Sequence, residues 1–139
     1  KEEQSIEFQN SLTEGDTLEV LRQGNKFMDL LKAKETNDAL SMLYEYDKSK
    51  DEMKPIGEGT REQFTARFRM FPVDMYLLQS YSFILPTQNQ LKYNMQFTMK
   101  TINGDDKCVT AIMFNPVKFD GKWYLTIPLH NDIKQDSIQ

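Results

Sequence analysis

Residues 91–101 read LKYNMQFTMKT, and hydrophobic and polar side chains alternate along this stretch without a break. A period of two places successive side chains on opposite faces of a strand. One wet face and one dry face are typical of a half-buried strand in an antiparallel sheet. The hydrophobic set is Leu91, Tyr93, Met95, Phe97 and Met99, and the polar set is Lys92, Asn94, Gln96, Thr98 and Lys100.

Further strands are predicted on both sides of this one. A less regular strand is expected over residues 74–85, and another over residues 108–115. Asp120-Gly121 is a tight hairpin signal before a last strand, which we expect over residues 122–129. Four strands joined by short turns predict an antiparallel meander in the second half of the chain.

Helices are predicted in the first half. Asp16, with Glu19 three positions later, has the spacing of a capping box, and the apolar period after it predicts a helix to about Lys34. Gly24 lies on the apolar face of this helix, where it costs about 1 kcal/mol of helix propensity. We therefore expect another part of the backbone to approach the helix closely at Gly24.

Two more helices complete this half. One is expected from residue 36 or 37 to Tyr44 or Tyr46, followed by a polar loop over residues 47–59. The other is expected over residues 60–71, and Pro72 ends it because proline disfavours helical geometry at the residue before it.

The predicted fold class is α+β, with two to three N-terminal helices packed on a curved four-stranded antiparallel sheet. In element order and in its aromatic-rich strands the chain resembles the cystatin-like group, and within it the nuclear transport factor 2-like folds. That resemblance implies a sheet wrapped around a long helix to make a cone. The chain is also similar to small envelope lipoproteins of Bacteroidetes, which implies a polar acidic tether over residues 1–15 and a single domain over residues 16–139.

Charge and composition exclude several classes of function. The net charge is −4, and the first 19 residues hold six acids against one lysine, so the rest of the chain is nearly balanced. A balanced domain offers no electrostatic footprint for nucleic acid. The single cysteine, Cys108, excludes an intramolecular disulfide and a thiolate metal cluster.

The acidic start of the chain predicts a location. A short polar segment ahead of a folded domain resembles the segment directly after the lipidated cysteine of a bacterial lipoprotein. We expect a protein of the bacterial cell envelope, periplasmic or at the surface, that meets a membrane only through a removed lipid anchor. The alternative is a trimmed end on a cytoplasmic protein.

The sequence contains no catalytic motif. The sole histidine, His130, lies just beyond the last predicted strand, and no Gly-x-Ser-x-Gly motif accompanies it. We predict no catalytic residue, no metal site and no cofactor. The alternative is an isomerase or dehydratase-type enzyme, because the resemblance implies a carboxylate and tyrosine site inside an apolar cone. The groups that such a site could use are Asp74, Tyr76, Tyr81 and Tyr93, although no family motif places them in these roles.

The inside of the cone is the better functional candidate. It is either a solid core or a pocket for a small apolar ligand. The opposite face of the central strand is either solvated or a surface through which two copies form a homodimer. The preferred interpretation is a non-enzymatic binding or protein-interaction domain. The candidate lining residues are Phe27, Tyr44, Tyr93, Phe97 and Trp123.

Overall fold

The computed structural model describes residues 2–128 and contains helices and one mixed sheet. The sheet has the order β2-β1-β6-β5-β4-β3, and its neighbouring strands are antiparallel except β1 and β6, which are parallel. In chain order the elements are α1 (Glu2–Ser11), α2 (Glu14–Lys32), α3 (Thr36–Leu40), β1 (Leu43–Asp47), β2 (Glu52–Pro55), α4 (Glu58–Met70), β3 (Val73–Leu85), β4 (Gln88–Thr101), β5 (Gly104–Phe119) and β6 (Lys122–Thr126).

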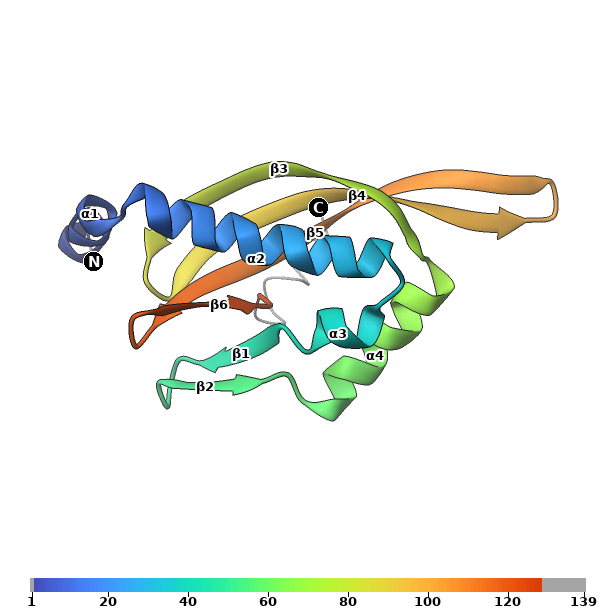
Figure 1. Cartoon of the computed structure of the whole chain (residues 1–139). Helices are drawn as coiled ribbons and strands as arrows, with labels where there is room; N and C mark the ends of the chain where they lie inside the picture. The colour runs from blue at the N-terminus through green and yellow to red at the C-terminus, as the bar shows by residue number, and fades with distance from the viewer. Residues whose placement is uncertain (1, 129–139) are drawn as a thin grey trace.

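The long helix α2 runs along one face of the sheet, and β3, β4 and β5 curve past it (Figure 1). We term the face that α2 covers the inner face and the opposite one the outer face. Helices α3 and α4 lie beside the C-terminal end of α2, and α1 lies at its N-terminal end (Figure 1). The hairpin of β4 and β5 projects past the end of α2, away from the rest of the molecule (Figure 1).

The α+β class and the antiparallel meander of β3 to β6 are confirmed. The alternation along residues 91–101 is present in β4, where Leu91, Tyr93 and Met95 are buried and their neighbours are not. The hairpin between β5 and β6 turns at Asp120 and Gly121, both with positive φ, as a tight turn of this type requires.

The prediction for residues 41–59 is wrong. The second helix ends at Leu40, and residues 43–47 form β1, which pairs with β2 on one side and with β6 on the other. The run contains apolar residues three and four apart, which fits a helix, but it also alternates in the way of a strand. The run forms a strand and not a helix because its backbone pairs with β6. The expected loop contains β2, so the sheet has six strands and not four.

The start of the chain also differs from the prediction. Residues 2–11 form α1 in place of an irregular tether, and Phe8 is buried in the core. The N-cap of α2 is Thr13 and not Asp16, because Asp16 is the third helical residue and completes the capping box with Thr13. The last strand was expected to reach residue 129, which lies outside the described residues, and it ends at Thr126.

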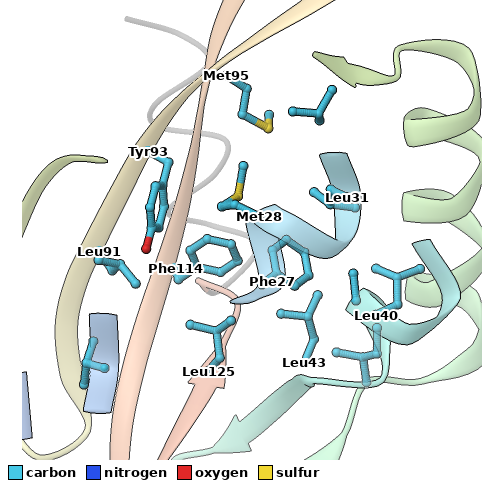
Figure 2. Close-up of a cluster of buried hydrophobic side chains, with 14 of the residues drawn as sticks. Phe27, Met28, Leu31, Leu40, Leu43, Leu91, Tyr93, Met95, Phe114 and Leu125 are labelled. Carbon is cyan, nitrogen blue, oxygen red and sulfur yellow. The ribbon is translucent and has the colours of Figure 1, made fainter. Parts of the chain in front are cut away.

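The core lies between α2 and the inner face. Phe27 and Met28 are fully buried and point from α2 toward the sheet, where Phe114 and Tyr93 meet them (Figure 2). The ring of Phe27 packs edge-on against Phe114 with centroids 5.1 Å apart. Burial of such side chains contributes about 1.5–3 kcal/mol each, so this layer is the main source of stability.

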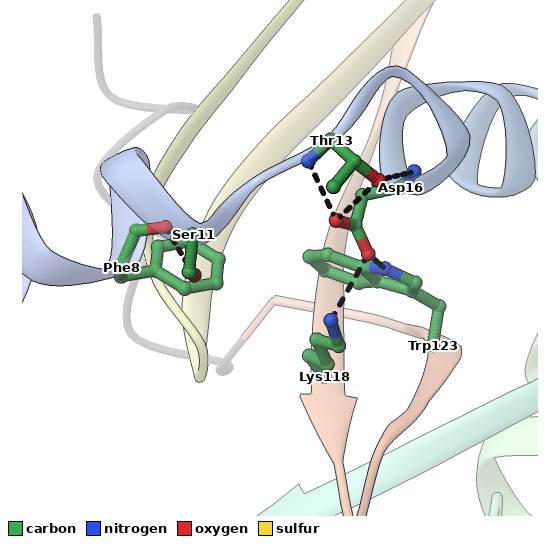
Figure 3. A network of polar contacts seen from close by, with 6 residues as sticks. All are labelled: Phe8, Ser11, Thr13, Asp16, Lys118 and Trp123. Atoms are coloured by element: carbon green, nitrogen blue, oxygen red, sulfur yellow. Dashed lines mark hydrogen bonds and ion pairs between the residues drawn. The ribbon is translucent and has the colours of Figure 1, made fainter.

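A polar network joins the start of α2 to the end of the sheet (Figure 3). Oδ1 of Asp16 accepts hydrogen bonds from Nε1 of Trp123 at 2.9 Å and from Nζ of Lys118 at 3.0 Å. Its second oxygen accepts the backbone N–H of Thr13 at 2.8 Å. One carboxylate therefore fixes the first turn of α2 against both β5 and β6.

Candidate groove between α4 and the sheet

An apolar groove lies on the inner face where α2 has ended. It has a volume of about 340 Å³, which is within the range of small-ligand sites. Its walls come from α4 and from three strands of the sheet. The lining residues are Arg67, Phe68, Phe71, Val73, Met95, Phe97, Thr110, Ala111 and Ile112.

Helix α4 supplies one wall because its aromatic residues recur at helical spacing. Phe64 and Phe68 are four apart and stack with centroids 6.0 Å apart, and Phe68 is buried. Phe71 comes after the last helical residue, and its ring contacts that of Phe97 with centroids 5.1 Å apart. The predicted helix over residues 60–71 is confirmed as α4, and its apolar face borders the groove.

The strands supply the floor. Phe97, Met95 and Ile112 lie on the inner face, in the same rows as the buried residues of the core. Tyr93 lies against Gly24 of α2, and Met95 lies near Met28 of α2 (Figure 2), whereas the groove that contains Phe97 has no residue of α2 in its lining. The groove is thus a part of the inner face that packs against α4 and not against the long helix.

Arg67 is the only charged residue that lines this groove in the part of the chain the structure describes. No carboxylate of the described residues forms an ion pair with its guanidinium. Arg67 also lines a second hollow of about 660 Å³, which lies between α4 and the β1 strand and is bordered by Ile127 and Pro128. A cation therefore stands between two adjoining hollows.

The structure does not bring the five predicted lining residues to one place. Phe27 and Tyr93 are fully buried in the core, and Trp123 is buried beside Phe8 and Asp16 at the far end of α2. Phe97 lies in the groove.

Tyr44 lies on the outer face. Its neighbour Leu43 pairs with Leu125 inside the core, so alternation directs Tyr44 to the opposite side of the sheet. There its ring packs edge-on against Tyr124, with centroids 4.9 Å apart.

The groups considered for an enzyme do not gather in the groove. Hydrogen bonds from Thr98 and Lys107 hold the pKa of Asp74 below its usual range, and the Thr98 bond is the larger cause. Burial, and then a hydrogen bond to Asp29, raises the pKa of Tyr76 to about 12. At neutral pH Asp74 is therefore ionised and Tyr76 is protonated. A general base works best when its pKa lies near the operating pH, and neither pKa is shifted toward that range.

Tyr93 is held in the same way. Its hydroxyl donates to Oδ1 of Asn25 at 2.8 Å, and burial raises its pKa. Tyr81 is exposed on β3, and His130 lies outside the described residues. The described residues contain no cluster of three or more histidine, cysteine or acidic side chains that could hold a metal ion. No described helix is long and apolar enough to cross a membrane.

Part of the groove is visible in sequence patterns. The helical spacing of Phe64, Phe68 and Phe71 predicts that they share one face, and Phe97 is one of the predicted lining residues. The charge pattern of α4 favours a solvated position for Arg67 over binding of an anion or acidic partner, because Glu58 and Glu62 are close in sequence. No pattern distinguishes Thr110. Arg67 and Thr110 both line the groove because the fold places the last turns of α4 opposite β5 across it, an arrangement that no local pattern of residues encodes.

No family model matches the chain, and no curated protein is similar to it in sequence. Among solved structures, it is similar to Aln2 from a Streptomyces species, with a TM-score of 0.49 and 10% sequence identity. The similarity covers 91% of this chain and 98% of that one. A similarity of this degree supports no inference about function.

Proposed function

We propose that the chain is a non-enzymatic binding domain whose ligand places an apolar group in the groove between α4 and the sheet. The observation that carries this proposal is the groove itself: an apolar hollow of about 340 Å³ on the inner face, with no residue of α2 in its lining. Where α2 lies on it, the same face is a packed core. Of the two adjoining hollows, this one has a single charged residue in its lining, whereas several charged residues line the other.

The composition of the walls supports binding over catalysis. The described residues place no carboxylate and no tyrosine in the lining of this groove. The enzyme alternative needs such a group within reach of a bound substrate. Arg67 at the edge favours a ligand that carries a negative charge beside its apolar part.

An anionic apolar dye, anilinonaphthalene sulfonate, tests the proposal. Thr110 is exposed and lines the groove, so Thr110→Arg fills the hollow without entering the core. Gln96→Arg is the matched control, because Gln96 lies on the outer face of the same pair of strands. We expect dye binding at least tenfold weaker in Thr110→Arg and unchanged in Gln96→Arg. Equal binding by both variants contradicts the proposal.

A homodimer through the outer face is a second proposal. Met75, Leu77 and Val109 are exposed there, with exposed fractions of 54%, 71% and 69%. The face between Lys92 and the ion pair of Asp74 and Lys107 carries no charge. A two-fold interface joins identical patches, so an uncharged apolar patch can meet its own copy without repulsion.

Light scattering on the protein as it elutes from a size-exclusion column measures its mass in solution. We expect a dimer for the natural chain and a monomer for Leu77→Lys, which places like charges opposite each other. Lys122→Glu, at an exposed site on β6, is a control that should leave the mass unchanged. A natural chain that is monomeric at high concentration contradicts this proposal.

The finer fold assignment and the location belong to the proposal as well. A long helix along the inner face of a curved sheet supports membership of the cystatin-like group, in its nuclear transport factor 2-like branch. A place in the bacterial cell envelope is proposed from the acidic composition of the first 19 residues alone, since residues 2–11 form α1 and not a tether. Fractionation of a bacterium that makes the natural protein tests the location, and recovery in the cytosol alone contradicts it.

A further inference from the structure

Strand β5 has a long edge without a partner strand in the described part of the chain. β5 pairs with β4 from residue 104 to residue 114, but β6 pairs only with Asn115–Phe119. β6 stops at Thr126, and Pro128 comes two residues later. Proline has no N–H to donate to a sheet, so it is typical of a position where pairing ends.

Hydrogen bonds fix which backbone groups face this edge. The N–H of Lys118 donates to the carbonyl of Pro86, and the carbonyl of Pro116 accepts from Asn89, so these residues face β4. The carbonyl of Asn115 accepts from the hydroxyl of Thr126, so Asn115 faces β6. Successive residues of an antiparallel strand direct their N–H and C=O groups to opposite sides of the strand.

The alternation extends along the strand because no register shift interrupts β5. Val109, Ala111 and Met113 therefore direct their N–H and C=O groups away from β4. No backbone hydrogen bond from another described residue reaches them on that side. Three donors and three acceptors stand in a row, like the open edge of a sheet.

This open edge is a wall of the groove. Ala111 lines the groove although its partner Asn94 lies on the outer face, so Ala111 contributes its main chain and not its side chain. The opposite wall is apolar, from Phe68 and Phe71. An exposed sheet edge is where an extended peptide can add as an extra strand, and a neighbouring pocket can hold its alternate side chains.

We propose that the ligand is an extended segment of a partner protein, which adds to β5 along Val109, Ala111 and Met113. Its alternate side chains enter the groove against Phe68 and Ile112, and an acidic side chain lies beside Arg67. The charge of Arg67, which has no carboxylate partner among the described residues, is what selects an acidic segment. This inference rests on the proposed function, since it names the ligand of the same groove.

A library of random displayed nonapeptides supplies the ligand for the test. The best peptide is synthesised with a single N-methyl group at each position in turn. Because an added strand donates only alternate N–H groups to its neighbour, methylation should weaken binding at least tenfold at every second position and leave the others unchanged. For a peptide that is bound through its side chains alone, the loss of affinity should not alternate along the sequence.

Two protein variants make the test specific to the edge and to the charge. Ala111→Pro removes one N–H on the open side, where an edge strand tolerates proline. Arg67→Gln removes the cation. We expect both to weaken binding at least fivefold, and Arg67→Gln to do so only for a peptide that keeps its acidic residue. Urea unfolding of each variant shows whether it is folded. The N-methyl scan uses the natural chain, so its result holds even if a variant does not fold.

Three outcomes overturn this inference. One is a bound peptide whose affinity does not alternate along the methyl scan. Another is a natural chain that binds the dye in the groove but no peptide of the library, which leaves the proposed function intact. The third is an edge occupied by a second copy of the chain. It would be detected as slower hydrogen exchange of the Ala111 and Met113 amides at higher protein concentration. Failure of both dye and peptide overturns the proposed function as well.

Discussion

Gly24 of α2 lies directly against the phenol oxygen of Tyr93 on β4, so that a methyl group at residue 24 would overlap it. Such a group would also lie 2.7 Å from a methyl carbon of Leu91. The sequence predicts a close approach at Gly24, and the structure confirms it. The neighbour is a pair of side chains and not, as expected, another backbone.

Gly24→Ala should therefore destabilise the protein even though alanine favours helices. Overpacking a core costs about 1–3 kcal/mol, and helix propensity returns up to about 1 kcal/mol. We expect the free energy of unfolding in urea to fall by about 1–2 kcal/mol. Gly59→Ala in α4 is the control, because nothing lies within 4 Å of its added carbon. That variant should be as stable as the natural chain or more so, and a stabilised Gly24→Ala would contradict the packing.

Asp16 should make stability depend on pH in the acid range. Burial alone would raise its pKa, but hydrogen bonds from Trp123, Thr13 and Lys118 outweigh burial and hold the pKa well below the ordinary value of 3.8. A lowered folded pKa gives stability that is present above the unfolded value and is lost as the pH falls through the folded one.

The comparison is with Asp16→Asn. We expect this variant to lose about 1–3 kcal/mol of unfolding free energy at pH 7, because it removes a charge from a nearly buried network. The difference from the natural chain should stay constant down to about pH 5 and shrink below about pH 4. Urea unfolding at pH 7, 5 and 3 measures it. A difference that grows toward low pH would be inconsistent with the network.

Tyr76 should lose its proton only at high pH, in part because of its hydrogen bond to Asp29. Its pKa is raised to about 12, first by burial and then by its hydrogen bond to Asp29 at 2.6 Å. We expect Tyr76 to remain largely protonated at pH 11, and Asp29→Asn to move its pKa toward the ordinary value of 10 without reaching it. Carbon NMR of the tyrosine ring follows both. An unchanged pKa in the variant would rule out the Asp29 contribution.

The open edge of β5 predicts a pattern of hydrogen exchange in the free protein. Amides that face β4 are bonded within the sheet, whereas those of Ala111 and Met113 face outward. We expect Ala111 and Met113 to exchange faster than Thr110 and Ile112 by at least tenfold, as unpaired amides do. Equal protection along the strand would show that something already occupies the edge.

Local patterns predict the parts of the fold that local physics decides. The strand over residues 91–101 is recognisable because burial of one face imposes a period of two. The prediction for residues 43–47 is wrong because Leu40, Leu43 and Tyr44 also fit a helix, and the strand exists through its pairing with β6. The pattern places the capping box at Asp16 because aspartate is both a good N-cap and a good third residue, and the structure has it as the latter.

The groove could not be predicted in the same way. Phe71 and Phe97 are distant in sequence and meet because Val73, two residues after Phe71, pairs with Phe97 across β3 and β4. The open edge depends on where β6 stops, which Pro128 influences but does not fix alone. Sequence patterns therefore identify single side chains of the site and not their assembly.

Binding of a ligand in the groove is tested most directly by methyl NMR of the natural chain during titration with anilinonaphthalene sulfonate. We expect saturable shifts of the methyl groups of Met95 and Ile112, which line the groove. The methyl groups of Leu43 and Leu125, which are buried in the core, should stay in place. Shifts confined to other surfaces, with Met95 and Ile112 unmoved at saturation, would contradict binding in the groove.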